Sequence, residues 1–347
     1  MKAAVVHARG DLRLEELPIP EVPAGSIRVR VRACAICGTD IRIYRKGDHR
    51  AQYPVVPGHE IAGVVDAVAP GVCGVREGER VCVAPGHGCG RCRMCRLGQP
   101  NVCLTPCPSL GYKVNGGFEQ YFAVPENIFR LGFVNPIPPG LGFRQASLSE
   151  IIACCLNAQR NTPVREGDVV LVIGSGPAGI IHSRLARLKG AAKVLLTQRS
   201  RSRLELAASR FPVDRTIASS EEDLEQIVME ETHGEGADVI YVCAPSAEAQ
   251  ETALRLAAPR GRINLFGGLP RDGNMIRVDA NTVHYKELFI GGASSSLPED
   301  NRRALALLAE GAIEADRLIT HTFGIEDIAA AFDVAESRQG IKVVVDL

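Results

Sequence analysis

The chain has 347 residues, more than one ordinary domain of roughly 100 to 200 residues holds, so its length predicts two domains. Its 40 basic and 40 acidic residues balance, which excludes the strongly charged surface that gathers nucleic acid or an anionic membrane. No stretch approaches the roughly 20 apolar residues of a membrane helix, and charges interrupt the N-terminal segment, so we expect a cytoplasmic protein with small-molecule partners.

The N-terminal part of the chain is rich in glycine, proline and short β-branched runs. Three examples are SIRVRVRAC at 26–34, EIAGVVDAVAP at 60–70 and ERVCVAP at 79–85. Turn residues end each run, which is typical of short strands joined by loops. This part of the sequence therefore predicts a compact β domain.

Two of the loops in this region carry side chains that suit a metal ion. The segment AICGTD contains Cys37, Thr39 and Asp40, and VVPGHE ends in His59 and Glu60. A thiolate, an imidazole and carboxylates together suit a borderline metal such as zinc. Each residue also has an ordinary structural interpretation, as a small buried side chain or a polar loop group.

Four cysteines then follow within fifteen residues: Cys89, Cys92, Cys95 and Cys103. Disulfides are disfavoured because the cytosol keeps thiols reduced. An iron–sulfur cluster is the second interpretation, since ferredoxins also begin C-x2-C-x2-C and Cys107 precedes a proline, but the ferredoxin spacing needs its fourth cysteine where this chain has Gln99. A zinc site that stabilises the loop is the third and favoured interpretation.

From Asp168 onward, apolar strands alternate with helical patterns, which predicts a parallel sheet covered on both faces. The expected strands include DVVLVIG, AKVLLTQ, ADVIYVCAP and GRINLFGG. The first ends in a G-x-G-x-x-G turn that opens a helix, the setting required for dinucleotide binding. Its glycines allow a tight turn, a close approach of backbone N–H groups to a pyrophosphate, and close helix packing. The expected contacts are Gly174, Gly176, Pro177, Ala178 and Gly179.

The end of the next expected strand bears on the choice of cofactor. An acidic residue there binds a free ribose 2′-hydroxyl, but this chain has Gln198, with Arg199 and Arg203 close by. A missing carboxylate beside arginines favours NADP over NAD. Gln198 is also able to hydrogen-bond an unphosphorylated ribose, so both cofactors remain open.

The remaining segment contains two helical patterns, at 299–311 and 325–340, before a final strand, IKVVVDL. Periodicity alone leaves open whether this segment continues the nucleotide domain or returns to the first domain.

Taken together, these motifs resemble the zinc-dependent medium-chain dehydrogenases, and within them the polyol and threonine dehydrogenase branch. The likeness covers essentially the whole chain. It rests on five motifs in family order: CGTD at 37–40, GHE at 58–60, the four-cysteine segment at 88–103, NGGFEQYFAVP at 115–125 and GSGPAG at 174–179.

The resemblance implies an α/β fold in which a Rossmann doubly wound parallel sheet accompanies a GroES-like β-barrel catalytic domain. The catalytic domain is expected at 1–148, with a structural-zinc lobe at about 86–106, and the Rossmann domain at 149–287. The C-terminal segment, 288–347, is expected to return to the catalytic domain.

The resemblance also implies two zinc ions per chain. Cys37 and His59 become ligands of a catalytic zinc, with Glu60 as a ligand or a close neighbour, and Glu150 as the carboxylate ligand typical of polyol-type members. Cys154 and Cys155 are alternatives, about one helical turn further along. The family places a structural zinc within the four-cysteine set, Cys89, Cys92, Cys95 and Cys103.

In the family, the hydroxyl at the position of Thr39 begins the proton relay, and a histidine often follows five positions after the cysteine. This chain has Arg42 there, and a guanidinium does not accept a proton. His49, or Glu60 with water, is an alternative relay, and Arg42 is an alternative contact to the cofactor or to an anionic substrate group.

Further cofactor contacts are implied at Gly267, Ala293 and Ser294, while Lys342 either reaches the cofactor or lies in solvent. The leading hypothesis is a zinc-dependent, NAD(P)-linked enzyme that oxidises a secondary alcohol of a polyol, cyclitol or sugar-like substrate. The alternatives are a zinc-free quinone or enone reductase of the same fold and a non-catalytic NADPH-binding protein. We expect a homo-oligomer, a tetramer or a dimer.

Overall fold

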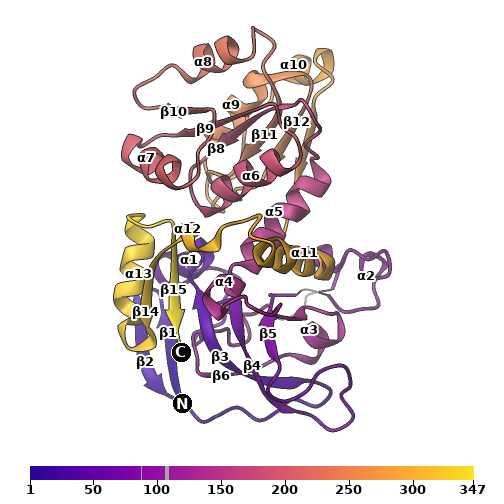
Figure 1. Ribbon diagram of the computed structural model, residues 1–347, viewed down its shortest axis with the longest axis vertical. Helices are drawn as coiled ribbons and strands as arrows, with labels where there is room; N and C mark the ends of the chain where they lie inside the picture. The colour runs from indigo at the N-terminus through magenta and orange to yellow at the C-terminus, as the bar shows by residue number, and fades with distance from the viewer. Residues whose placement is uncertain (87, 106–108) are drawn as a thin grey trace. The chain divides into compact units, whose positions relative to one another are not determined.

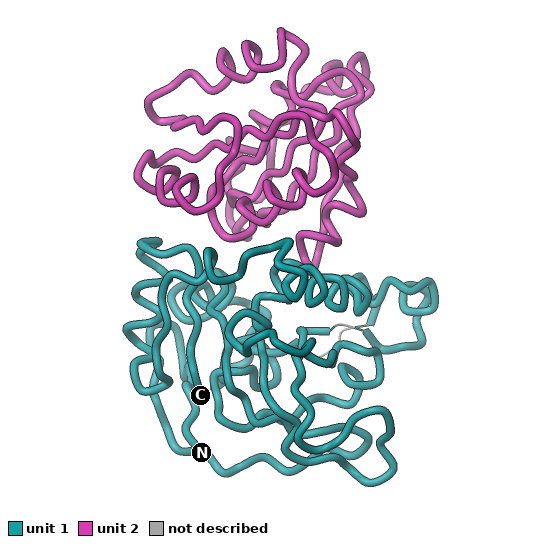
Figure 2. The backbone as a smooth tube through the Cα atoms, viewed as in Figure 1, with its two compact units in different colours: residues 1–153, 295–347 teal, residues 154–294 magenta. Residues whose placement is uncertain are grey.

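The computed structural model describes residues 1–86, 88–105 and 109–347. The chain forms two compact units, drawn in different colours in Figure 2. Unit 1 comprises Met1–Ala153 and Ser295–Leu347, and unit 2 comprises Cys154–Ser294. One unit is therefore continuous in sequence and the other is assembled from the two ends of the described chain.

Unit 1 is built on a mostly antiparallel seven-stranded sheet in the order β14-β15-β3-β4-β5-β7, with β6 also paired to β3, and on a two-stranded sheet of β1 and β2 (Figure 1). Its strands are β1 (Lys2–Ala8), β2 (Asp11–Glu16), β3 (Ile27–Ala35), β4 (Glu60–Val68), β5 (Arg80–Val83), β6 (Tyr121–Ala123), β7 (Val134–Pro136), β14 (Ile319–Gly324) and β15 (Lys342–Asp346).

The alternation of side chains along β3 shows why this segment forms a strand with one buried face. Val29 and Val31 are buried, whereas the arginines between and beside them point to the other face. Aromatic side chains from distant segments, including Phe118, Phe122 and Phe332, fill the core beneath. This burial of apolar surface supplies the main stabilisation of the unit.

The C-terminal segment returns to unit 1. Its last strand, β15, pairs antiparallel with β3, with Val344 opposite Ala35, and pairs on its other side with β14. The helices of unit 1 are α1 (Gly38–Lys46), α2 (Arg93–Arg96), α3 (Glu126–Arg130), α4 (Phe143–Ser147), α11 (Pro298–Ala309), α12 (Ala315–Leu318) and α13 (Ile328–Ser337), with short 3-10 turns η1 (Pro100–Val102) and η2 (Ile325–Asp327).

Unit 2 contains a six-stranded, all-parallel sheet in the order β10-β9-β8-β11-β12-β13. In chain order this is 3-2-1-4-5-6, the doubly wound Rossmann arrangement, so the fold class expected from the sequence is confirmed. The strands are β8 (Val169–Ile173), β9 (Lys193–Gln198), β10 (Arg215–Ala218), β11 (Ala237–Val242), β12 (Ala257–Leu265) and β13 (Phe289–Gly292).

Helices connect these parallel strands, as parallel pairing requires. They are α6 (Pro177–Leu188), α7 (Arg201–Arg210), α8 (Leu224–Glu231), α9 (Ala247–Leu256) and α10 (Ala280–Tyr285), while α5 (Ser149–Asn161) begins in unit 1 and ends in unit 2. Unit 2 ends at Ser294 rather than at the expected residue 287, because β13 pairs with β12 at the edge of the sheet.

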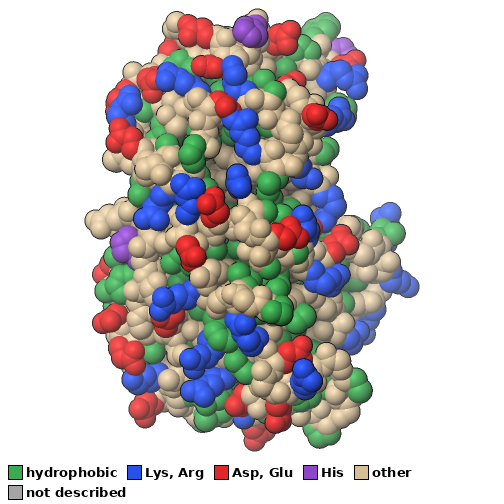
Figure 3. Space-filling view, viewed as in Figure 1, with side chains coloured by type: hydrophobic (Ala, Val, Ile, Leu, Met, Phe, Trp, Pro, Cys, Tyr) green, Lys and Arg blue, Asp and Glu red, His purple; other side chains and the backbone are tan. Residues whose placement is uncertain are grey.

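The surface carries no dominant charge on the face shown in Figure 3, where basic and acidic side chains are interspersed. This agrees with the equal numbers of the two kinds in the sequence. Within the described ranges, every helix is too short or too polar to cross a bilayer.

Candidate active site and zinc centres

The pairing of β3 with β4 brings the first group of candidate ligands together. Ala35, at the end of β3, lies opposite Glu60, the first residue of β4. Cys37 follows β3 by two residues and caps α1, and His59 immediately precedes Glu60. As a result, one ligand atom from each of Cys37, His59 and Glu60 lies within 4.8 Å of the others.

Asp40 holds the two loops of this cluster in place. Its buried carboxylate accepts the backbone N–H of Cys37 at 2.8 Å and that of Gly58 at 3.0 Å, which joins the start of α1 to the loop before β4. One of its oxygens lies 3.4 Å from Nδ1 of His59 without the alignment of a hydrogen bond. Burial lowers the pKa of His59, but the charges of Asp40 and Cys37 outweigh this and raise it well above its usual value.

Glu60 is paired with a lysine from the far end of the described chain. Nζ of Lys342, on β15, lies 2.5 Å from Oε1 of Glu60 and donates to the carbonyl of Ile36 at 3.0 Å. Both side chains are buried, so Lys342 does not lie in solvent, contrary to one of the two alternatives considered for it. Burial raises the pKa of the Glu60 carboxyl to about 7, while Lys342 acts in the opposite direction.

The unsatisfied atoms of this cluster are consistent with a cation. Oε2 of Glu60 and Nδ1 of His59 are buried and hydrogen-bonded to nothing in the described parts of the chain. A buried polar atom left without a partner is costly. Sulfur, nitrogen and oxygen donors at close range are those that zinc accepts, so the cluster fits the expected catalytic zinc.

Glu150 stands in the first turn of α5 and is 6% exposed. Its carboxylate is not part of the group of ligand atoms that lie within 4.8 Å of one another, but its charge raises the pKa values of both Glu60 and Lys342. Of the two cysteines considered as alternatives, Cys155 is buried and its Sγ lies 3.8 Å from the carbonyl of Ala178, a contact made within unit 2.

Thr39 lies in the first turn of α1, beside Cys37. Its Oγ1 accepts a hydrogen bond of 3.3 Å from Arg42, the residue that stands where the family often has a histidine. His49, the alternative relay, is exposed, and its Nδ1 lies 3.6 Å from Asp48.

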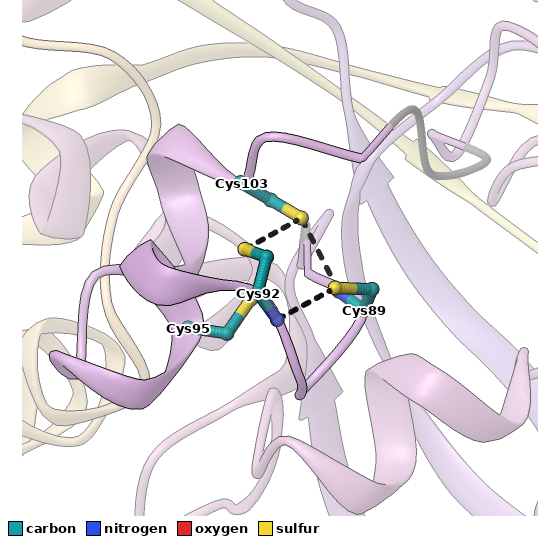
Figure 4. Close-up of side chains that lie close together, drawn as sticks. All are labelled: Cys89, Cys92, Cys95 and Cys103. Carbon is teal, nitrogen blue, oxygen red and sulfur yellow. Dashed lines mark hydrogen bonds between the residues drawn. The ribbon is translucent and has the colours of Figure 1, made fainter.

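The four cysteines of the second group converge in space (Figure 4). One sulfur of each of Cys89, Cys92, Cys95 and Cys103 lies within 4.8 Å of the others, and all four are free thiols. Sγ of Cys92 lies 3.7 Å from Sγ of Cys103. Two sulfurs on one tetrahedral zinc are separated by about 3.8 Å when Zn–S is about 2.3 Å, so the spacing fits a structural zinc.

Backbone N–H groups stabilise thiolates in this group. The N–H of Arg91 is the main cause that lowers the pKa of Cys89 to about 5, and that of Cys95 lowers the pKa of Cys92. Burial raises the pKa of Cys95 to about 11. Cys107, considered above as a ligand of an iron–sulfur cluster, lies outside the described residues, as do residues 87 and 106 of the expected lobe.

The glycine turn occupies the junction of β8 and α6. Gly174 has φ +114°, a conformation that favours glycine, and Gly176 precedes the helix, whose first residues are Pro177 and Ala178. A Cβ on Gly179 would overlap the carbonyl oxygen of Gly174, so only glycine lets α6 approach the turn this closely. The turn thus has the form expected for a pyrophosphate site at a helix N-terminus.

The other predicted cofactor contacts also belong to unit 2. Gln198 ends β9, and its Oε1 accepts the backbone N–H of Ser175 at 3.4 Å. Arg199 is exposed and Arg203 is half-buried in α7. Gly267 follows β12 and donates to the carbonyl of Val242, and a Cβ there would meet the backbone of Ala244. Ala293 and Ser294 follow β13, the latter accepting a hydrogen bond from Asn157.

Comparison with known proteins places this geometry in a family. Residues 23–132 match the family model for the alcohol dehydrogenase GroES-like domain, and residues 177–310 match that for zinc-binding dehydrogenases. The chain is 30% identical to a sorbitol dehydrogenase of Halalkalibacterium halodurans, with 99% of this chain and 98% of the relative covered. It is 33% identical to an L-threonine 3-dehydrogenase of Pyrococcus horikoshii, with 95% and 94% covered.

The chain belongs to the zinc-dependent medium-chain dehydrogenase family. The resemblance inferred from the motifs is thereby confirmed, and the protein is an NAD(P)-dependent alcohol or polyol dehydrogenase that acts on a CH–OH group.

Solved structures agree with this assignment. The dehydrogenase superposes with a TM-score of 0.91 on a zinc-binding dehydrogenase from Sinorhizobium meliloti bound to NADP, at 30% identity, with 100% of this chain and 99% of that chain covered. It superposes with a TM-score of 0.90 on an alcohol dehydrogenase from Escherichia coli in complex with NADH, at 32% identity, with 100% and 99% covered. Of these two structures, which resemble the chain about equally, one contains NADP and the other NADH.

Sequence reasoning missed two features of the dehydrogenase. The first is the ion pair of Lys342 with Glu60, for which the available signal was a lysine directly before three apolar residues in the strand IKVVVDL. The second is the set of contacts that joins Arg42 to Asp48, Arg50 and Tyr112. The only sequence signal for this set was a run of charged residues, and such runs are common in exposed loops, so it did not predict these contacts.

Proposed function

We propose that this dehydrogenase oxidises a secondary hydroxyl group of a polyol, cyclitol or sugar-like alcohol to a ketone, reversibly. Cys37 and His59 would hold the catalytic zinc with Glu150, and Glu60 would act as a further ligand or a close neighbour. The observation that carries the proposal is the convergence of a thiolate, an imidazole and a carboxylate within 4.8 Å. These are donors that zinc accepts in catalytic sites.

The cofactors and the protein have separate tasks in this reaction. When bound, zinc supplies Lewis-acid chemistry that makes an alcohol hydroxyl acidic, and the nicotinamide supplies a hydride acceptor. Thr39 is the residue proposed to meet the substrate hydroxyl. Its Oγ1 already accepts one hydrogen bond from Arg42. A second lone pair remains to accept the proton of the substrate hydroxyl, and the threonine hydroxyl proton remains to be donated to the next group.

Arg42 itself does not take the proton, because a guanidinium stays charged throughout the working pH range. It orients Thr39 instead, and the proton leaves through Glu60 or water. Asp40 keeps the backbone N–H groups of Cys37 and Gly58 fixed and thereby positions the metal-binding loops.

Two observations support a polyhydroxylated substrate. The residue at the expected third ligand position is Glu150, whereas simple alcohol dehydrogenases of the family have cysteine there. In addition, the relative from Halalkalibacterium halodurans is a sorbitol dehydrogenase, matched over nearly its whole length.

For the cofactor, we propose NADP in preference to NAD. β9 ends in Gln198 rather than in an acidic residue, and Arg199 and Arg203 follow it closely in the sequence, so their charges would neutralise a 2′-phosphate. A ratio of kcat/KM for NADP over NAD above 1 is the expected result, and a ratio below 1 contradicts this part of the proposal.

The decisive experiment is a panel of polyols, cyclitols and simple alcohols assayed with both cofactors by the absorbance of the reduced nicotinamide, in protein that contains two zinc ions per chain. Turnover of polyols supports the proposal. Reduction of quinones or enones by zinc-free protein favours the alternative reductase, and absence of all turnover despite NADPH binding favours a non-catalytic protein. The presence of Cys37, His59 and Glu60 in one cluster argues against both alternatives.

We also propose a homo-oligomer, a tetramer or a dimer, that acts in the cytoplasm. β13 is the last strand of the parallel sheet, and its Phe289 and Ile290 are exposed, as is Tyr285 at the end of α10. Large exposed apolar side chains beside an open strand edge are typical of an interface between subunits. Sedimentation of the purified protein tests this, and a monomer at micromolar concentration contradicts it.

A further inference from the structure

Two arginines and a tyrosine surround one buried carboxylate next to Thr39. Asp48 exposes only 3% of its side chain, while Arg42 and Arg50 expose 40% and 52%. Oδ2 of Asp48 accepts Nε of Arg42 and Nη2 of Arg50, each at 2.8 Å, and Oδ1 accepts Nε of Arg50 at 3.0 Å. Two guanidinium groups thus share a single carboxylate, and the group carries a net charge of +1.

The oxygen atoms of this group are fully used, but its N–H and O–H groups are not. The hydroxyl of Tyr112 accepts Nη2 of both Arg42 and Arg50, at 3.3 and 3.0 Å, so both of its lone pairs are occupied and its proton remains to donate. Nη1 of each arginine donates to nothing in the chain as the structure describes it. The group therefore offers hydrogen-bond donors and positive charge, and its complement is an anion with several oxygen atoms.

The loop that carries these residues is held before any ligand arrives. The backbone N–H of Gln52 donates to the carbonyl of Tyr112 at 2.7 Å, which ties the loop to the segment of the tyrosine. The guanidinium of Arg50 also stacks on the ring of Tyr112, 4.6 Å from its centre. A ligand would meet donors already in place and would lose little free energy in ordering them.

This group borders the proposed site of reaction. Nη2 of Arg42 donates to Oγ1 of Thr39, so one side chain separates the donor surface from the hydroxyl that is proposed to meet the substrate. A substrate whose reacting hydroxyl lies at Thr39 can therefore extend an anionic group towards Arg42, Arg50 and Tyr112.

We propose, on the basis of the function proposed above, that Arg42, Arg50 and Tyr112 bind an anionic group of the substrate, and that the preferred substrates are polyols bearing a phosphate monoester or a carboxylate. A planar guanidinium group binds two oxygen atoms of a phosphate or carboxylate at once. Two neighbouring guanidinium groups therefore favour an anionic substrate group over a neutral hydroxyl at the same position.

The test compares one neutral polyol with its anionic counterpart, sorbitol with sorbitol 6-phosphate, both in turnover and in binding measured by calorimetry without cofactor. We expect the phosphate to bind more tightly and to have the higher kcat/KM. In Arg50→Ala, the ratio of the two kcat/KM values should fall about 10- to 100-fold, because charge-assisted hydrogen bonds are lost. Arg50→Lys should recover part of the ratio, and Arg13→Ala, an exposed arginine of β2, should leave it unchanged.

The same variants distinguish the possible sources of the anion. A rise in KM for NADP in Arg50→Ala, with the substrate ratio unchanged, assigns the group to a phosphate of the cofactor and overturns the proposal. Equal binding of sorbitol and sorbitol 6-phosphate to the wild-type protein overturns it as well. Absence of turnover with both compounds contradicts the proposed function. The anion site is still supported in that case if the wild-type protein binds sorbitol 6-phosphate more tightly than sorbitol and Arg50→Ala does not.

Thermal unfolding and circular dichroism of each variant show whether the loop remains folded. Tyr112→Phe provides a second variant if Arg50→Ala is unstable. It removes one donor while leaving both arginines on Asp48, and the expected result is a fall in the ratio in the same direction.

Discussion

The two groups of candidate metal ligands differ in where they lie in the fold. Cys37, His59 and Glu60 lie at the junction of β3 and β4, above a buried core, and their neighbours include a buried lysine. The four cysteines instead lie on a segment whose regular structure is the short helix α2 and the 3-10 turn η1, and none of the four is buried. The first group would keep its place without a metal, whereas the second has little besides the metal to hold it.

Because of this difference, we expect activity to depend on zinc at the first group and local folding to depend on zinc at the second. A site built on paired strands holds mixed donors in fixed positions and leaves room for a substrate. A loop closed by four thiolates has no further ligand position, and its folding and its metal binding are the same event. Removing metal should therefore affect activity at one site and local order at the other.

The largest effect is expected from Cys37→Ser. Loss of the catalytic zinc should lower kcat/KM about 1000-fold or more, because the metal contributes several kcal/mol of transition-state stabilisation. The zinc content should fall from two ions to one, and the melting temperature should change little. Steady-state kinetics and metal analysis measure these quantities, with Cys73→Ser, an exposed cysteine, as the matched control. A variant that keeps both zinc ions contradicts the assignment of Cys37.

Lys342→Met tests whether the buried cluster depends on its lysine. The substitution leaves the Glu60 carboxylate buried without a counter-charge, and we expect a loss of about 3 to 5 kcal/mol in the free energy of unfolding. The double variant Lys342→Met/Glu60→Gln should recover much of this loss. Lys2→Met removes the exposed pair with Glu326 and should cost about 1 kcal/mol or less. If urea unfolding gives equal losses in the free energy of unfolding for Lys342→Met and Lys2→Met, burial of the ion pair does not determine its contribution to stability.

Cys92→Ser should disturb the four-cysteine group in a different way. We expect loss of one zinc ion, faster amide hydrogen exchange across residues 89–103, and a melting temperature lower by roughly 5 °C. The expected fall in kcat/KM is less than tenfold, far smaller than for Cys37→Ser. Unchanged hydrogen exchange in metal-free protein would contradict a structural role for this group, and Cys73→Ser again serves as the control.

The smallest effect concerns Glu119, a buried carboxyl that, within the described part of the chain, lacks a cationic partner such as Glu60 has. Burial raises its pKa from 4.5 to about 8, with only Asn115 acting in the other direction. The folded state therefore holds this proton more tightly, so its contribution to stability is complete below pH 4.5 and is lost as the pH rises towards 8.

Between pH 6 and pH 7 the wild-type protein should lose about 1 kcal/mol more than Glu119→Gln, whose side chain does not titrate. Urea unfolding at the two pH values measures the difference. Glu126→Gln, at a largely exposed position, should retain the wild-type slope. Parallel pH dependence of wild-type protein and Glu119→Gln would rule out the buried carboxyl as its source.

The sequence predicted those parts of the molecule that depend on local patterns. The turn at Gly174, Gly176 and Gly179 was found because a strand and a helix flank it, and the fold class followed from the alternation of strands and helices. The four cysteines were found because they lie within fifteen residues of one another. In each case the residues that act together are also close in the chain.

Local patterns did not predict the contacts between distant segments, although the family resemblance implied that Cys37 and His59 meet and that the C-terminal segment returns to the catalytic domain. Lys342 and Glu60 are separated by 282 positions, and nothing in IKVVVDL identifies a carboxylate partner. The contacts of Tyr112 with Arg42 and Arg50 likewise span 70 and 62 positions. Periodicity also left the direction of the final segment open, because pairing of β15 with β3 depends on edges that only the folded sheet presents.

The position of β15 has a consequence for synthesis of the protein in the cell. Lys342 is made 306 residues after Ile36, whose carbonyl it contacts, an interval of roughly 15 to 60 s at ordinary translation rates. During that time the end of the nascent β3 at Ala33–Ala35 lacks β15, and Glu60 lacks Lys342. We therefore expect Glu60 to lack its lysine partner until β15 has left the ribosome.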